Sequence, residues 1–318
     1  MGNNFYNSTT LKSIEMPAST MLLFDLVKSS KTNVALITSL YQSSYKEPIN
    51  LSLIRVFNKS NDVGFGTGYN LNILYQLSKS NQTITLTHPT FDTETFVSYS
   101  TQTDVNGTTF EIYHSQTTKN TIYYNSETQE YTYRNDSCEV TFDSTSFYNK
   151  SYTYKTQNGN YTVDIAYNST YGYIGSISNR VSDTETMTFS YSRTYFTYCS
   201  QIVVTKRINM QIKQIEKITL GYSGTHVNSI KNYVLGQTTP QYEKTFTTTS
   251  PIVVTDVVSG ISSSFSLTDS AVSGFVLPTH SYNVYYDNEC GGREKAKERF
   301  ENIASSSVKD VKNQSAYS

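Results

Sequence analysis

The sequence predicts an all-β protein: one long, curved antiparallel sheet of successive hairpins that forms a partial shell or roll, with a short C-terminal helix. The 318 residues include 28 Tyr and 15 Phe but no Trp, and only 16% of them are charged. Tyr, Phe, Thr, Val and Ile suit a pleated sheet with one face in water. Short alternating segments recur every 8–12 residues or so, a spacing typical of sandwiches, barrels and rolled sheets.

Residues 1–49 are expected to form lead-in strands. Short apolar runs occupy residues 21–27 and 33–41, and the second run is rich in β-branched residues, which favours strands over helices. The N-terminus has no basic start followed by an apolar run, so we identify no signal peptide. No segment approaches the roughly 18 apolar residues that a membrane-spanning helix needs.

Residues 50–270 are expected to form the sheet of repeated hairpins. The pairs Asn106-Gly107 and Asn158-Gly159 lie between strand-like segments and favour tight hairpin turns. Weak internal repetition supports the same architecture, because three alternating strands that end in Tyr are each followed by a polar turn and a strand with Ile. The pairs are Tyr167 with Ile174, Tyr191 with Ile202, and Tyr222 with Ile230. Such repetition suits a sheet that lengthens by one hairpin at a time.

Residues 271–318 form a C-terminal tail of different character. The segment 291–313 is charged, helix-prone and opens with a pair of glycines. We expect a short helix there, with its charges on a solvated face.

The segment 50–77 reads NLSLIRVFNKSNDVGFGTGYNLNILYQL, a strand followed by a Gly-rich turn and a second alternating strand. It resembles the N-terminal part of the rearrangement-hot-spot (Rhs) or YD-repeat family, in which Trp is usual at the position of Tyr69. Later Tyr-ended hairpins look like those of the family, so that the resemblance covers about residues 20–235. The Tyr-Asp-x-x-Gly repeats and the C-terminal core motif of the family are missing. The resemblance implies a long sheet that rolls into a shell, used by relatives for encapsulation, surface display or adhesion.

The glycine turn is predicted to be structural. Its residues are Gly64, Phe65, Gly66, Gly68 and Tyr69, with Thr67 between the last two glycines. A dinucleotide-binding loop requires GxGxxG before a helix, whereas this segment reads GxGxG before a strand. Glycines in strands usually mark bulges and bends, so no cofactor is predicted.

No metal site is predicted from the histidines and cysteines. They are far apart in the sequence and show no ligand spacing: His88, His114, His226, His280, Cys138, Cys199 and Cys290. A single disulfide between Cys138 and Cys199 stays open, because three cysteines define no framework.

The chain is predicted not to be an enzyme. No GxSxG elbow is present. Glu111, Asp143 and Asp164 would serve a glycosidase only if two of them lay about 5–10 Å apart in space, which the sequence does not determine. A carbohydrate-binding module or a β-scaffold glycoside hydrolase is therefore the alternative function.

Four tyrosines are candidates for contact with a glycan or a protein partner. They are Tyr123, Tyr124, Tyr131 and Tyr133. A row of exposed rings would offer a flat surface for stacking. The favoured interpretation is that alternate rings pair across strands and stabilise the sheet.

Taken together, the residues predict a non-catalytic structural or surface protein that serves shell formation, encapsulation or adhesion. A net charge of -1 gives no general attraction to nucleic acid. An extracellular or cell-surface location is expected, and the open edges of a partial shell would favour self-association.

Overall fold

A computed structural model of the chain describes residues 26–29, 34–42, 50–105, 107–156, 159–170, 172–179, 185–192, 198–208, 211–234, 236–268, 271–276 and 281–283. All helical or strand structure within these ranges is β-strand, which confirms the all-β prediction. No helix among the described residues is long and apolar enough to cross a membrane. The helix expected at 291–313 lies outside the described residues.

The lead-in segment forms a small antiparallel sheet, here called the inner sheet. Its strands are β1 Leu26–Ser29, β2 Val34–Gln42, β3 Asn50–Val56 and β4 Tyr69–Leu71, in that spatial order. Residues 50–56 and 69–71 thus pair with the lead-in strands, and the larger sheet begins at Gln76. The domain boundaries at 49 and 270 stay a prediction.

Each strand from β5 to β23 pairs antiparallel with the next strand in sequence, which confirms the long sheet of successive hairpins. The strands are β5 Gln76–Ser80, β6 Thr83–Thr87, β7 Thr93–Thr103, β8 Thr109–Ser115, β9 Thr121–Asn125, β10 Glu130–Arg134, β11 Cys138–Asp143, β12 Asn149–Thr156, β13 Gly159–Tyr167, β14 Ile174–Asn179, β15 Glu185–Ser192, β16 Tyr198–Ile208, β17 Gln211–Ser223, β18 His226–Val234, β19 Tyr242–Phe246, β20 Ile252–Asp256, β21 Ile261–Thr268, β22 Ala271–Val276 and β23 Ser281–Asn283.

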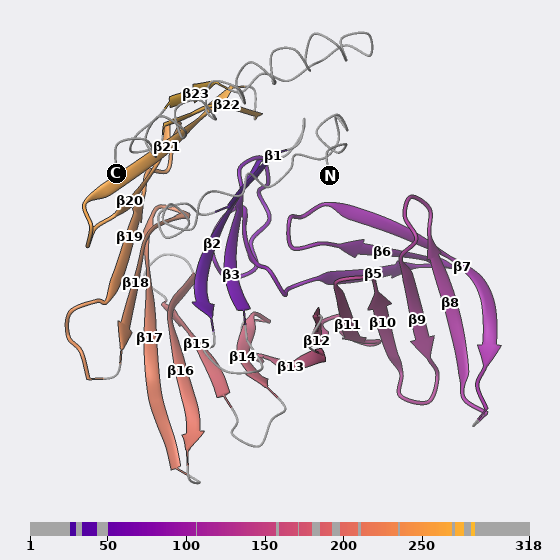
Figure 1. Cartoon of the computed structure of the whole chain (residues 1–318). Helices are drawn as coiled ribbons and strands as arrows, with labels where there is room; N and C mark the ends of the chain where they lie inside the picture. The colour runs from indigo at the N-terminus through magenta and orange to yellow at the C-terminus, as the bar shows by residue number, and fades with distance from the viewer. Residues whose placement is uncertain are drawn as a thin grey trace, which may run out of the picture.

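The large sheet has two parts that curve differently. Strands β5–β12 are here called the curl. They bend back until an isolated bridge joins Gln76 to Tyr148. The side-chain amide of Asn149 donates to the carbonyl of Ile73 at 2.9 Å. Strands β13–β23 form an extended wall (Figure 1). No ladder between β5 and β23 occurs among the described residues, so the sheet as a whole is open.

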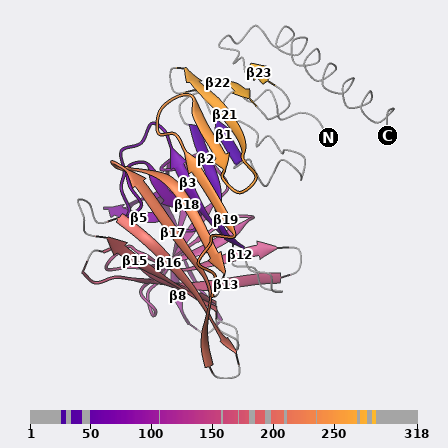
Figure 2. The same cartoon turned by 90° about the vertical axis from the view of Figure 1, so that its left-hand side faces the viewer.

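The inner sheet lies against the concave side of the wall (Figures 1 and 2). Alternation in β3 decides which side chains enter this interface, because Leu51 and Leu53 face the wall while Ile54 and Val56 face the opposite side. The opposite side is covered by Phe91, from the turn between β6 and β7. Both faces of β3 are therefore largely buried.

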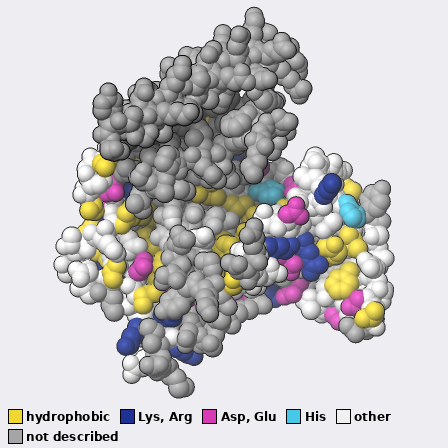
Figure 3. All heavy atoms as spheres, in the orientation of Figure 1, with side chains coloured by type: hydrophobic (Ala, Val, Ile, Leu, Met, Phe, Trp, Pro, Cys, Tyr) yellow, Lys and Arg dark blue, Asp and Glu magenta, His cyan; other side chains and the backbone are white. Residues whose placement is uncertain are grey.

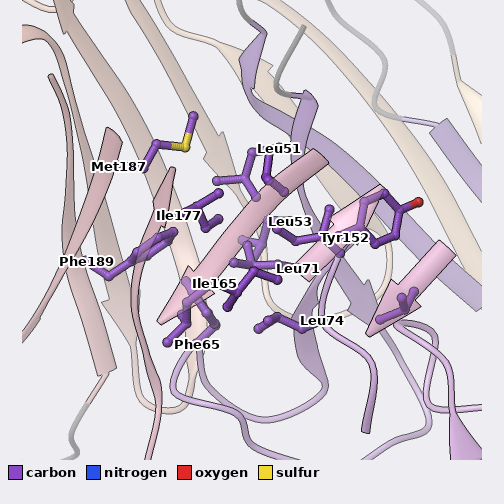
Figure 4. Close-up of a cluster of buried hydrophobic side chains, with 14 of the residues drawn as sticks. Leu51, Leu53, Phe65, Leu71, Leu74, Tyr152, Ile165, Ile177, Met187 and Phe189 are labelled. Atoms are coloured by element: carbon purple, nitrogen blue, oxygen red, sulfur yellow. The ribbon is translucent and has the colours of Figure 1, made fainter. Parts of the chain in front are cut away.

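The main core fills the space between the inner sheet and the large sheet (Figure 4). Leu51, Leu53 and Leu71 from the inner sheet meet side chains from β13 to β15, among them Ile177 and Met187. Burying one such side chain stabilises the fold by about 1.5–3 kcal/mol. The concave face of the wall is thus filled by the chain itself.

A second cluster extends the same interface toward the end of the wall. Val34 and Leu36 of β2 pack with Ile252 and Val254 of β20 and with Phe265 of β21. The inner sheet therefore contacts the wall along much of its length.

Candidate functional site

The point at which the inner sheet is fastened to the wall is the turn at residues 64–69, here called the glycine clasp. Gly64, Gly66 and Gly68 have φ angles of 95°, 94° and 77°, a region that other residues rarely adopt. A Cβ on Gly66 would lie 2.2 Å from the carbonyl oxygen of Thr225, in the turn between β17 and β18. Only glycine permits so close an approach between two backbones.

Backbone hydrogen bonds hold the clasp to the wall. The amide of Thr67 donates to the carbonyl of Thr225 at 3.0 Å, and the amide of Cys199 donates to the carbonyl of Gly64 at 2.7 Å. Between these bonds the ring of Phe65 is fully buried and meets Phe189 edge-on, with ring centroids 6.2 Å apart. The clasp thus joins β15, β16 and the β17–β18 turn to the inner sheet.

Tyrosine rings surround the clasp on the wall side. Tyr222 donates its hydroxyl to the carbonyl of Cys199 at 2.7 Å, and Tyr191 donates to the carbonyl of Ile174 at 2.6 Å. Burial raises the pKa of both phenols above their ordinary value, and the nearby Cys199 thiol adds to the effect. These phenols therefore act as neutral donors that support the backbone beneath the clasp.

Tyr69, the residue at the usual Trp position of the resembled family, closes the clasp. Its ring is buried and its hydroxyl donates to the carbonyl of Val227 in β18 at 3.3 Å. Burial raises the pKa of Tyr69 to about 12. The guanidinium of Arg55 lies 5.7 Å from the centroid of this ring. The sequence alone did not single out Arg55, although its place two residues after Leu53 puts a charge on a core-facing position.

The four candidate tyrosines do not form one exposed row. Tyr131 and Tyr133 are buried on the inner face of the curl, and Tyr124 pairs with Tyr131 across the strands, with ring centroids 4.7 Å apart. Tyr123 pairs with Thr132 on the opposite face, because side chains alternate along a strand. The pair of Tyr124 and Tyr131 agrees with the favoured interpretation, in which alternate rings pair across strands. Tyr131 and Tyr133 are therefore not available for outside contact, and contact through Tyr123 stays a prediction.

The inner tyrosines gather around the amino group of Lys79, on β5. The Nζ atom lies 5.5 Å from the ring centroid of Tyr113, 5.7 Å from Tyr124 and 5.4 Å from Tyr131, and it donates to the Tyr131 hydroxyl at 3.0 Å. Such contacts stabilise a cation over aromatic faces. In the space-filling view, charged and hydrophobic side chains lie side by side on the part of the molecule formed by the curl (Figure 3).

A second polar group that the sequence did not reveal surrounds Glu94, on β7. This carboxylate is buried and accepts hydrogen bonds from Ser115 at 2.5 Å, from Thr118, from Asn120 at 3.2 Å and from His88 at 3.1 Å. His88 belongs to the β6–β7 turn, Ser115 ends β8, and Thr118 and Asn120 lie between β8 and β9. Glu94 thus fastens two turns at one end of the curl.

The three carboxylates considered for glycosidase chemistry lie on different elements. Glu111 accepts from the Tyr113 hydroxyl at 2.5 Å, and burial together with this bond raises the pKa of Tyr113 to about 12. Asp143 accepts from the amides of Thr145 and Ser146 and so stabilises its own turn. Asp164 lies on β13, opposite Ser151 of β12.

Cys138 and Cys199 are free and buried, so the disulfide that the sequence left open between them is not formed. The thiol of Cys138 lies 3.8 Å from the Tyr75 hydroxyl, and that of Cys199 donates to the carbonyl of Gln201 at 3.6 Å. No group of three metal-ligating side chains occurs within the described ranges. Cys290 and His280 lie outside them.

No known family model and no curated protein matches the chain. Among solved structures, the N-terminal domain of the effector protein SpvB from Salmonella typhimurium strain LT2 aligns with 63% of this chain and 98% of its own, at 8% identity and a TM-score of 0.45. The Tc holotoxin pore of Photorhabdus luminescens aligns with 77% of this chain at 11% identity and a TM-score of 0.49, and the chain spans 16% of its length. Likenesses at these scores carry no argument about function.

Proposed function

We propose that the chain is a non-catalytic structural module: a partial β-shell that works outside the cell or at its surface. The observation that carries this proposal is the unbroken series of antiparallel ladders from β5 to β23, with the inner sheet seated in its concave side. Continuous ladders satisfy the backbone groups of every interior strand and make a stiff wall. The resemblance of residues 50–77 to the Rhs family agrees with this function.

The filled interior favours surface display or adhesion over encapsulation by this segment. Side chains of the inner sheet occupy the concave face of the wall, so a cargo would first have to displace a buried core. Contact with a partner then falls to the outer face and the strand edges. On the outer face of the curl the Arg134 guanidinium lies 4.8 Å from the ring centroid of Tyr123, and its Nε lies 2.8 Å from the carboxylate of Glu139.

Glycan binding is a second candidate, favoured by one observation. Tyr148 stacks on Tyr167 with ring centroids 4.5 Å apart and is 43% exposed. An exposed ring that a second ring holds in place is a surface on which a sugar can stack.

A binding and hydrolysis screen over one panel of polysaccharides tests both candidates. The structural proposal predicts no release of reducing sugar, either from the wild type or from the triple variant Glu111→Gln, Asp143→Asn, Asp164→Asn. Release that the triple variant abolishes would overturn it in favour of a glycosidase. Binding without release that is lost in Tyr148→Ser but kept in Tyr123→Ser would assign glycan recognition to the Tyr148 stack.

A further inference from the structure

A small cavity lies between the inner sheet and the wall. Its volume is about 10 Å³, and its lining comes mainly from apolar side chains such as Leu53, Ile230 and Phe246. The polar residues of the lining are Thr38, Arg55 and Tyr69. A cation therefore borders a cavity that is otherwise mostly apolar.

Among the residues that the structure describes, no carboxylate forms an ion pair with the buried Arg55. Arg55 is 6% exposed. Its guanidinium donates to the carbonyl of Thr248 at 2.8 Å and to that of Thr247 at 3.5 Å. The guanidinium also lies 4.3 Å from the ring centroid of Phe57. None of these partners carries a negative charge, and the ion pairs within the described ranges do not include Arg55.

Two carbonyls and two aromatic rings solvate this cation incompletely. A guanidinium has five N–H donors, and the two carbonyls accept from two of them. Burial lowers the pKa of Arg55 from its ordinary value. The ionisable group beside it is His226. Burial and the charge of Arg55 lower the pKa of His226, which favours its neutral form. A neutral imidazole does not balance the charge of Arg55. A buried charge is costly unless an opposite charge accompanies it.

We propose that the cavity binds a small monovalent inorganic anion, such as chloride, against the guanidinium of Arg55. The volume is close to that of one water molecule and therefore favours a single small ion over phosphate or an organic acid. The anion would accept the remaining N–H groups of Arg55 and neutralise its charge. Because Arg55 lies on β3 and its carbonyl partners follow β19, the bound anion would stabilise the contact between the inner sheet and the wall.

The test is thermal unfolding of the full chain in sodium chloride and in sodium gluconate, at equal ionic strength and pH. Ligand linkage predicts that chloride at ten times its Kd raises the midpoint by on the order of 3 °C in the wild type. Arg55→Met removes the cation but keeps an unbranched side chain, and it should abolish the difference between the salts. The control Arg207→Met removes an exposed arginine and should keep the difference.

Bromide locates the ion independently of any variant, which matters if Arg55→Met fails to fold. Crystals of the wild type grown in sodium bromide should give an anomalous peak beside Arg55. Unfolding midpoints that respond identically to both salts in wild type and Arg55→Met would overturn the proposal. Density for water alone at that position in saturating bromide would overturn it as well.

Discussion

The carbonyl oxygen of Thr225 lies 2.2 Å from the place that a Cβ on Gly66 would occupy. Gly66 belongs to the turn between β3 and β4, whereas Thr225 belongs to the turn between β17 and β18. Two segments separated by about half of the chain thus meet backbone to backbone. This contact places the inner sheet in the concave side of the wall.

Replacing Gly66 by Ala should destabilise the protein far more than replacing Gly107 by Ala. Both glycines have positive φ, 94° and 86°, so both substitutions cost about 1–2 kcal/mol in backbone strain. A Cβ on Gly107 meets nothing within 4 Å, whereas one on Gly66 meets backbone and should cost about 1–3 kcal/mol more. Urea unfolding of the two variants measures the difference. Equal losses of stability would show that the close approach is not formed.

Tyr222→Phe should cost about 1–3 kcal/mol, because it leaves the carbonyl of Cys199 without the hydroxyl that donates to it. Tyr123→Phe, which also removes a phenolic hydroxyl, serves as the control because that ring lies on the outer face of the curl. Its unfolding free energy should stay within about 0.5 kcal/mol of wild type. The account of the clasp fails if the two variants lose the same stability.

The network around Glu94 should make the free energy of unfolding depend on pH in the acid range. Burial alone would raise the pKa of Glu94, but hydrogen bonds from Ser115, Thr118 and Asn120 and the charge of His88 outweigh it and hold the pKa below its ordinary value of 4.5. A carboxylate whose pKa is lower in the folded state than in the unfolded state stabilises the fold. This stabilisation is complete above the unfolded-state pKa and is lost as the pH falls through the folded-state pKa.

Free energies of unfolding between pH 7 and pH 2 measure this dependence. The difference in the free energy of unfolding between wild type and Glu94→Gln should therefore become smaller below about pH 4.5. Glu139→Gln, at the exposed ion pair with Arg134, should show a much smaller gap. Parallel wild-type and Glu94→Gln curves across this range would contradict the role given to Glu94.

The buried thiols should resist modification in the folded protein. Burial raises the pKa of the Cys138 thiol above its ordinary value and that of Cys199 to about 12, so few thiolates form at neutral pH. In a Cys290→Ser variant, a thiol reagent should label neither cysteine until denaturant is added, and then both. Mass spectrometry under non-reducing conditions that found a Cys138–Cys199 bridge would refute the free-thiol assignment.

Alternation along the strands predicted the hairpin sheet because each strand has one buried face, a property that the sequence records locally. The glycine turn was also visible, but its partner was not, since nothing near Gly66 in the sequence points to Thr225. The same holds for Lys79 and Glu94. Glu94 is buried two residues before Phe96, and Lys79 stands two residues after Leu77 at the exposed end of β5, yet the groups that satisfy their charges come from other strands. The cross-strand pairing of Tyr124 with Tyr131 followed from alternation, but the burial of Tyr131 and Tyr133 did not, because curvature decides which face of a strand is inside.

Native-state hydrogen exchange tests most directly whether the inner sheet is sealed into the wall. The account predicts that amides of β2 and β3 open together with those of β16–β18, with one common free energy, and that Gly66→Ala lowers this free energy for all of them. Rapid exchange of β2 and β3 while β16–β18 stay protected would contradict the central claim that the two sheets form a single core.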